Sequence, residues 1–140
     1  MKRLLLLFSL FFSLSFYGQN DQSEKQQTKE GCYVTINGIV QKGIVKMKKE
    51  QFKNMVIGYY INLQNQTVSD KAISFSIKIP GVQAEQIKGG KIDEHMYQKI
   101  LRTASRGDKI TFFDIKRNWK NSKFNGIICD GAAPLVIEIY

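Results

Sequence analysis

Apolar and polar residues alternate along several stretches of this chain, and the alternation predicts a domain built mainly from β-strands. The stretches with the clearest alternation are residues 55–63, 72–79 and 134–140. The apolar residues that share one parity in them are Met55, Ile57, Tyr59, Ile61 and Leu63, then Ile73, Phe75, Ile77 and Ile79, and finally Leu135, Ile137 and Ile139. A period of two is typical of a strand with one buried face, so these residues are the expected core positions of three strands.

Two further segments extend the predicted sheet. Residues 32–37 alternate weakly and lead into Asn37-Gly38, a pair suited to a type I′ turn. Together with the apolar run at 39–45 they predict either a hairpin or a strand with a bulge. Residues 110–116 combine aromatic and β-branched side chains, which favour a strand.

One α-helix is predicted at about residues 93–106. Asp93 can cap its first turn with a side-chain oxygen. The apolar residues that form a single stripe along it are Met96, Ile100, Leu101 and Ala104. Gly107 is expected to end the helix in a left-handed conformation. The polar residues 46–54 are predicted to hold a helical turn, and residues 82–93 to be a connection.

These elements fit a single β-rich domain spanning residues 31–140. We expect an antiparallel β-sandwich of about six or seven strands, with the helix packed on it. Residues 117–131 are expected to form a loop anchored by Trp119 and Phe124.

The residues before position 31 differ in composition from the rest and are predicted to precede the fold. Residues 1–18 join Lys2 and Arg3 to an apolar run, the pattern of a secretory signal peptide that is cut near Gly18. The run is shorter than the roughly 20 residues that span a bilayer, so a membrane anchor is the weaker alternative. Residues 19–30 contain no apolar side chain and predict a flexible leader. The mature chain is therefore expected in the periplasm, in the cell envelope or outside the cell, without a transmembrane segment.

The chain is basic. Its formal net charge is +9, and loss of Lys2 and Arg3 with the signal peptide leaves +7. Nucleic acid is the first partner that this charge suggests, but an exported protein rarely meets it, and the lysines lack interleaved aromatic stacking residues. A basic face toward acidic polysaccharide, lipid head groups or an acidic protein fits the expected compartment better. A solvated surface without a ligand is the open alternative.

Candidate catalytic and metal-binding residues are few. Cys32 and Cys129 lie near opposite ends of the predicted domain and form a possible disulfide in an oxidising compartment, although the sequence does not show whether their Cα atoms come within bonding reach. His95 is the only histidine, and nothing in the spacing brings it to a nucleophile. Two cysteines without further ligands do not make a zinc site. The sequence therefore predicts no catalytic residue, no metal site and no cofactor.

Three other features have simpler explanations than a functional site. Residues 106–108 (Arg-Gly-Asp) match an adhesion tripeptide, but their place between a helix and a strand predicts a turn. Residues 89–91 (Gly-Gly-Lys) lack the spacing of a phosphate-binding loop and also predict a turn. Asp114 shares the parity of Phe112, so it is expected to be a partly buried acid with a structural hydrogen bond.

The order and spacing of several segments resemble a known bacterial family. The segments are SFSIKIPG at 74–81, GGKID at 89–93, RGDKITFFDIK at 106–116 and PLVIEI at 134–139. Together they are similar to the C-terminal domain of GldM, the gliding-motility and type IX secretion protein of Bacteroidetes, over about residues 35–140. The resemblance implies an immunoglobulin-like β-domain that contacts partner proteins in the periplasm and has no catalytic residues.

Export, the lack of a catalytic constellation and the resemblance together predict a non-catalytic protein-protein interaction module of the periplasm or cell envelope, as an accessory to gliding motility or type IX secretion. The alternative is a domain that binds carbohydrate or another envelope polymer, which the charge and the aromatic residues favour. A third alternative is an enzyme or enzyme inhibitor whose site joins His95 to a cysteine or a carboxylate. The aromatic residues expected to supply a binding surface are Tyr59, Tyr60, Trp119 and Tyr140.

Overall fold

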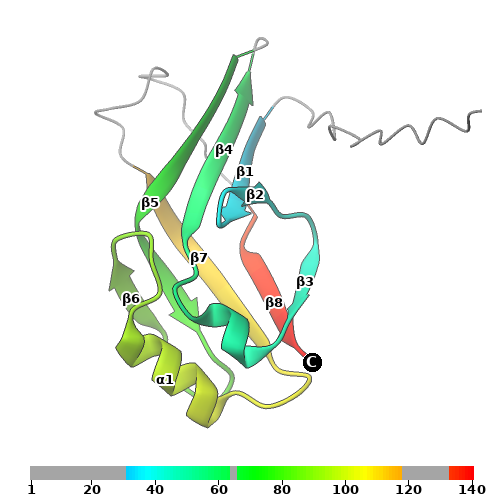
Figure 1. Cartoon of the computed structure of the whole chain (residues 1–140), viewed down its shortest axis with the longest axis vertical. Coiled ribbons are helices and arrows are strands. Elements are labelled where there is room, and N and C mark those ends of the chain that lie inside the picture. The colour runs from blue at the N-terminus through cyan, green and yellow to red at the C-terminus, as the bar shows by residue number, and fades with distance from the viewer. Residues whose placement is uncertain (1–30, 64–65, 118–132) are drawn as a thin grey trace, which may run out of the picture.

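The computed structural model describes residues 31–63, 66–117 and 133–140. Within these residues the chain is mainly β, as predicted, and forms an eight-stranded sheet with one α-helix (Figure 1). The strands are β1 (Gly31–Ile36), β2 (Ile39–Val40), β3 (Ile44–Met47), β4 (Ile57–Leu63), β5 (Gln66–Lys78), β6 (Glu85–Lys88), β7 (Lys109–Arg117) and β8 (Leu135–Ile139), and the helices are the 3-10 helix η1 (Lys49–Phe52) and α1 (Glu94–Thr103). The predictions that fall outside the described residues concern the signal peptide at 1–18, the leader at 19–30, Trp119, Phe124 and Cys129.

The sheet is curled, and the order of its strands explains why. The order is β2-β1-β4-β5-β7-β8-β3, with β6 paired to β5 beside this path. Strands β2 and β3 stand at opposite ends of the order, yet the four Cα steps from Val40 to Ile44 join them and span at most roughly 14 Å. In a flat sheet the two end strands would lie about 29 Å apart. The sheet therefore curls until its two ends come near each other, as Figure 1 shows for β2 and β3.

The hairpin predicted at Asn37-Gly38 is confirmed, but its second arm is shorter than expected. Asn37 and Gly38 have φ values of 51° and 82°, and a type I′ turn requires positive φ at both central residues. Only Ile39 and Val40 pair back onto β1. The chain then leaves this hairpin and forms β3, which pairs in parallel with β8. The apolar run at 39–45 is thus divided between the two ends of the sheet.

The core fills the inner face of the curled sheet. Residues of the predicted parity in β4 and β8 are buried, except Leu63 at the end of β4, which is partly buried. The buried apolar side chains from these strands are Ile57, Tyr59, Ile61, Leu135, Ile137 and Ile139. Phe112 of β7 packs between two other buried rings, at 6.4 Å from Phe52 and 5.7 Å from Phe75 between ring centroids. These contacts join η1, β5 and β7 into one cluster.

The expectation that Ile73 faces the core is wrong, because β5 is irregular at this point. Ile73 is 49% exposed, whereas Ala72 and Phe75 are buried. The pairing of β5 with β7 shifts register between Ala72 and Ser74 and again between Ser74 and Ser76. A β-bulge inserts an extra residue and so reverses the parity of the side chains beyond it. The strand is also longer than predicted and begins at Gln66.

Residues 82–93 contain a strand that the sequence analysis treated as a connection. Strand β6 pairs with the second half of β5, and the turn predicted at Gly89-Gly90 follows it. The amide of Ile57 donates to the Gly90 carbonyl at 2.7 Å. A Cβ on Gly90 would lie 2.6 Å from the Ala72 carbonyl oxygen, closer than any side chain tolerates. Gly90 therefore serves the close approach of this turn to β4 and β5.

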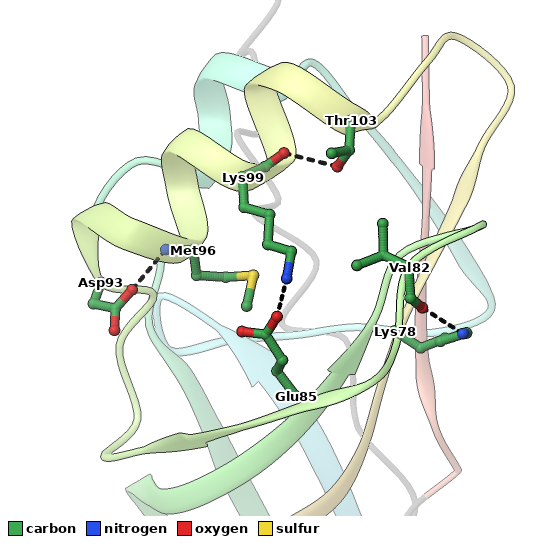
Figure 2. Close-up of polar contacts among 7 residues, drawn as sticks. All are labelled: Lys78, Val82, Glu85, Asp93, Met96, Lys99 and Thr103. Carbon is green, nitrogen blue, oxygen red and sulfur yellow. Dashed lines mark hydrogen bonds and ion pairs between the residues drawn. The ribbon is translucent and has the colours of Figure 1, made fainter.

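The helix begins as predicted but ends sooner. Asp93 caps α1 because its Oδ1 accepts a hydrogen bond from the Met96 amide at 2.7 Å (Figure 2). The helix stops at Thr103, and Ala104 already has an extended backbone with ψ near 140°. Gly107, with φ of 90°, therefore lies in the turn after the helix and does not end it.

Two lysine contacts hold α1 against the rest of the domain. Figure 2 shows the Lys99 side chain reaching from α1 to Glu85 of β6, with which it forms an ion pair. At the other end, Lys49 Nζ of η1 donates to the carbonyl oxygens of Leu101 and Ala104, both at 3.0 Å. The last carbonyls of a helix have no partner within the helix, and a cation is favoured beside them. Lys49 thus caps α1 from a distant part of the chain.

The Arg-Gly-Asp tripeptide forms the predicted turn and is fixed to the end of β8. The Gly107 amide donates to the Ile139 carbonyl at 2.7 Å, and the Ile139 amide donates to the Asp108 carbonyl at 2.9 Å. The Asp108 side chain accepts from the Ser105 amide at 2.8 Å. The polar groups of Asp108 therefore serve the local structure.

Candidate interaction surface

Strand β3 is one end of the sheet, and its two faces differ in polarity. Val45 and Met47 point inward and pack against the core. Ile44 and Lys46 point outward, and 52% of the Ile44 surface is exposed. In Figure 1 β3 lies at the margin of the sheet, with β8 on its inner side. The chain thus presents an exposed isoleucine and a lysine on an end strand.

The outer edge of β3 has backbone groups that no described residue pairs with. The Tyr140 amide donates to the Met47 carbonyl at 3.3 Å, so the polar groups of Met47 face β8. Backbone groups of successive strand residues point to opposite sides, so those of Ile44 and Lys46 face away from β8. The free edge ends at Lys48, whose amide donates to Gln51 Oε1 at 2.7 Å.

Lysines surround this edge. Between positions 42 and 53 the chain contains five lysines and one acidic residue, Glu50. The lysines are Lys42, Lys46, Lys48, Lys49 and Lys53, and all except the helix-capping Lys49 are exposed. On the neighbouring strand, Glu138 is in register with both Lys46 and Lys109, so one acidic residue stands between two lysines. Among the described residues around β3, the lysines therefore outnumber the acidic residues Glu50 and Glu138, and the surface carries a net positive charge.

A second surface feature is a hollow of about 560 Å³ on the outer face of β1, β4 and β5. It lies over Gly58, and its lining includes Thr35, Ser69, Asp70 and Lys71. A Cβ on Gly58 would meet the Asp70 carbonyl oxygen at 2.4 Å, so glycine is required here. Two residues farther along the same two strands, Tyr33 is in register with Tyr60, and the centroids of their rings are 6.5 Å apart.

A buried polar cluster lies between β4, β5 and β7. The Tyr59 hydroxyl donates to the Ile115 carbonyl, and Arg117 is only 4% exposed. Burial raises the pKa of Tyr59, although the charge of Arg117 opposes this shift. Burial also lowers the pKa of Arg117, an effect that Asp70 and Tyr59 oppose. This cluster supports the packing of three strands. Because Tyr59 is buried in it, Tyr59 does not contribute to a surface that binds another molecule.

The Tyr59→Phe variant tests this cluster through its pH dependence. At neutral pH we expect it to unfold about 1 kcal/mol more easily, because it leaves the Ile115 carbonyl without its donor. Since the folded pKa of Tyr59 is raised, its contribution is complete below pH ~10 and is lost as the pH rises further, when the unfolded phenol ionises first. The stability difference from wild type should therefore shrink as the pH rises above about 10 in urea titrations. A difference that stays constant or grows would contradict this assignment.

The structure places the other predicted residues as follows. His95 is exposed on the first turn of α1, and Asp114 is exposed with a φ of 47°. The expectation that Asp114 is partly buried is wrong, because its left-handed backbone breaks the alternation of β7. Tyr60 is partly buried, and Tyr140 is 53% exposed beside β3. Cys32 lies on β1 and borders a small hollow with residues 133–135, whereas Cys129 lies outside the described residues.

No cluster of three or more metal-ligating side chains occurs among residues 31–63, 66–117 and 133–140. In the same part of the chain, no helix has the length and apolar character needed to cross a membrane. No protein-family model matches this chain, and a search of curated proteins found no significant match.

The outer edge of β3, which no described residue pairs with, does not follow from the sequence pattern. The apolar run at 39–45 was assigned to a hairpin, and the lysines that follow it to a connection. The density of lysines was the available signal, because it marks a surface that repels like charges. The position of β3 at an end of the sheet depends on its pairing with β8, about ninety residues later in the chain.

Proposed function

We propose that this chain is a non-catalytic protein-binding module that is exported to the periplasm or cell envelope. The observation that supports it most directly is the lysine-rich outer edge of β3, which no described strand pairs with, and its exposed Ile44. Exposed edge strands invite pairing with another chain, and proteins that keep them usually control what pairs there. The signal-peptide pattern of residues 1–18 supports the compartment.

In this proposal the domain works as an accessory to gliding motility or type IX secretion. The similarity of four segments to the C-terminal domain of GldM supports that role and implies an immunoglobulin-like sandwich. The curled, mostly antiparallel sheet with one helix is compatible with such an arrangement. A similar fold does not by itself establish a function, so the proposed role is tested by identifying the protein that this chain binds.

The experiment is cross-linking of the tagged chain in the cells that make it, followed by denaturing purification and mass spectrometry. The tag belongs in the predicted leader, residues 19–30, because Tyr140 donates to Met47 of β3 and a tag attached to Tyr140 would disturb this contact (Figure 1). A tagged, exported domain of similar net charge is the control. We expect envelope proteins of the gliding or secretion machinery to be enriched over this control and to bind the purified chain. Recovery of glycan fragments without any specific protein would overturn the proposal.

A second candidate function, binding of an envelope polymer, is favoured by the hollow over Gly58 and the adjacent tyrosine pair. Hydroxyl, carboxylate and ammonium groups beside aromatic rings are the usual components of a sugar-binding surface. A Tyr60→Ala variant should then lose retention on purified cell-envelope glycan, while a Tyr140→Ala variant should keep it. Equal retention of both variants would exclude this surface as the binding site.

A further inference from the structure

We infer that β3 binds an extended, acidic segment of a partner protein, which adds to the sheet as a further strand. This inference rests on the proposed protein-binding function and specifies the place, the chemistry and the geometry of the contact. Three properties of the β3 edge carry it: the direction of its backbone groups, the charge around it and the point where it ends.

The backbone geometry admits one further strand. Ile44 and Lys46 direct their amide and carbonyl groups away from β8, and no described residue pairs with them. The two residues are about 6.7 Å apart along the strand, the spacing at which an added strand exchanges hydrogen bonds. The edge therefore offers two donors and two acceptors in the arrangement that strand addition uses.

The charge selects an acidic segment. Side chains of an added strand stand about 5 Å from those of β3, so its outward residues would lie beside Ile44 and Lys46. A second copy of this chain would place lysine beside lysine, which is unfavourable. A neutral segment would gain nothing from Lys42, Lys46 and Lys48, whereas glutamate or aspartate would pair with them. The lysines therefore oppose self-association at this edge and favour an acidic partner.

The contact is short. Because the Lys48 amide already donates to Gln51, strand pairing is limited to Ile44–Met47. A contact of this length depends strongly on its ion pairs, so binding should weaken as salt is added. The natural segment should therefore combine alternating acidic residues with an apolar residue that covers Ile44.

The test is a titration of the ¹⁵N-labelled exported chain with a capped synthetic peptide of alternating glutamate and valine, at low salt. We expect the amides of Ile44 and Lys46 to shift and to exchange more slowly, while those of Val45 and Met47, which already face β8, change little. A peptide with lysine in place of glutamate should have no such effect. Unchanged Ile44 and Lys46 amides with the glutamate peptide would overturn the inference.

Charge-reversal variants connect this titration to the natural partner. K42E/K46E changes the charge beside β3, and K88E/K91E makes the same change at exposed lysines near β6. Only the first variant should lose the cross-linked partner and at least tenfold of the affinity for the glutamate peptide. If both variants keep the partner equally, this inference fails while the proposed function stands. If the wild-type chain captures no partner, the proposed function fails, and the peptide titration alone decides whether the edge accepts an acidic strand.

Discussion

Replacing Phe112 by alanine is expected to lower the free energy of unfolding by about 3–5 kcal/mol, the range typical of a fully buried phenylalanine. Phe112 has no exposed surface and lies between the rings of Phe52 and Phe75. Its removal leaves a cavity where η1, β5 and β7 meet, and the strands cannot move together to fill it without breaking their pairing. Urea titration followed by circular dichroism measures the loss.

The next residue provides a matched control. Phe113 is on the same strand, but it faces outward opposite Ser76 and is only partly buried. The same truncation there removes less buried apolar surface, so Phe113→Ala should cost no more than about 1–2 kcal/mol. The slope of the urea transition should be unchanged in both variants. If both variants lost the same free energy of unfolding, the face of β7 that carries Phe112 would not be the buried one.

Features determined by neighbouring residues could be predicted from the sequence. The positive φ angles of Asn37 and Gly38 follow from the two residues themselves, and the cap of α1 follows from Asp93 and the apolar stripe behind it. The alternation in β4 and β8 also held, because each of these strands is regular and has one buried face. In these places the local pattern and the tertiary packing demand the same conformation.

Features determined by distant pairing could not be predicted. The bulge near Ile73 exists because β5 pairs with β7 through two register shifts, and the sequence pattern alone reads as continuous. Strand β6 is only four residues long, and its pairing with β5 decides that it is a strand. The helix end differs for a similar reason: Lys49, about fifty residues earlier, supplies the donors for the last carbonyls.

The candidate interaction surface shows the same division. The net charge of the chain predicts a basic face toward acidic polysaccharide, lipid head groups or an acidic protein, and the lysines of residues 42–53 contribute to that charge. The free backbone edge was not visible, because it depends on β3 leaving the hairpin and pairing with β8 at the far end of the strand order. The basic character of the surface could therefore be predicted from the composition. The location of the proposed binding edge could be found only from the order of the strands in the sheet.

The second large effect concerns the predicted bond between Cys32 and Cys129. We expect the exported chain to contain no reactive thiol, and reduction to lower its stability by ~4 kcal/mol, because the bond would close a loop of roughly a hundred residues. Cys32 borders the same hollow as residues 133–135, and Cys129 precedes residue 133 by only four positions.

Thiol counting under denaturing conditions and urea titration with and without reductant test this prediction together. The Cys32→Ala variant is the control, because reductant should no longer change its unfolding midpoint. Part of the cost of that variant would come from lost packing, so the effect of reductant on the wild type measures the bond itself. Two reactive thiols in the exported chain, or an unfolding midpoint that reductant leaves unchanged, would show that the bond does not form.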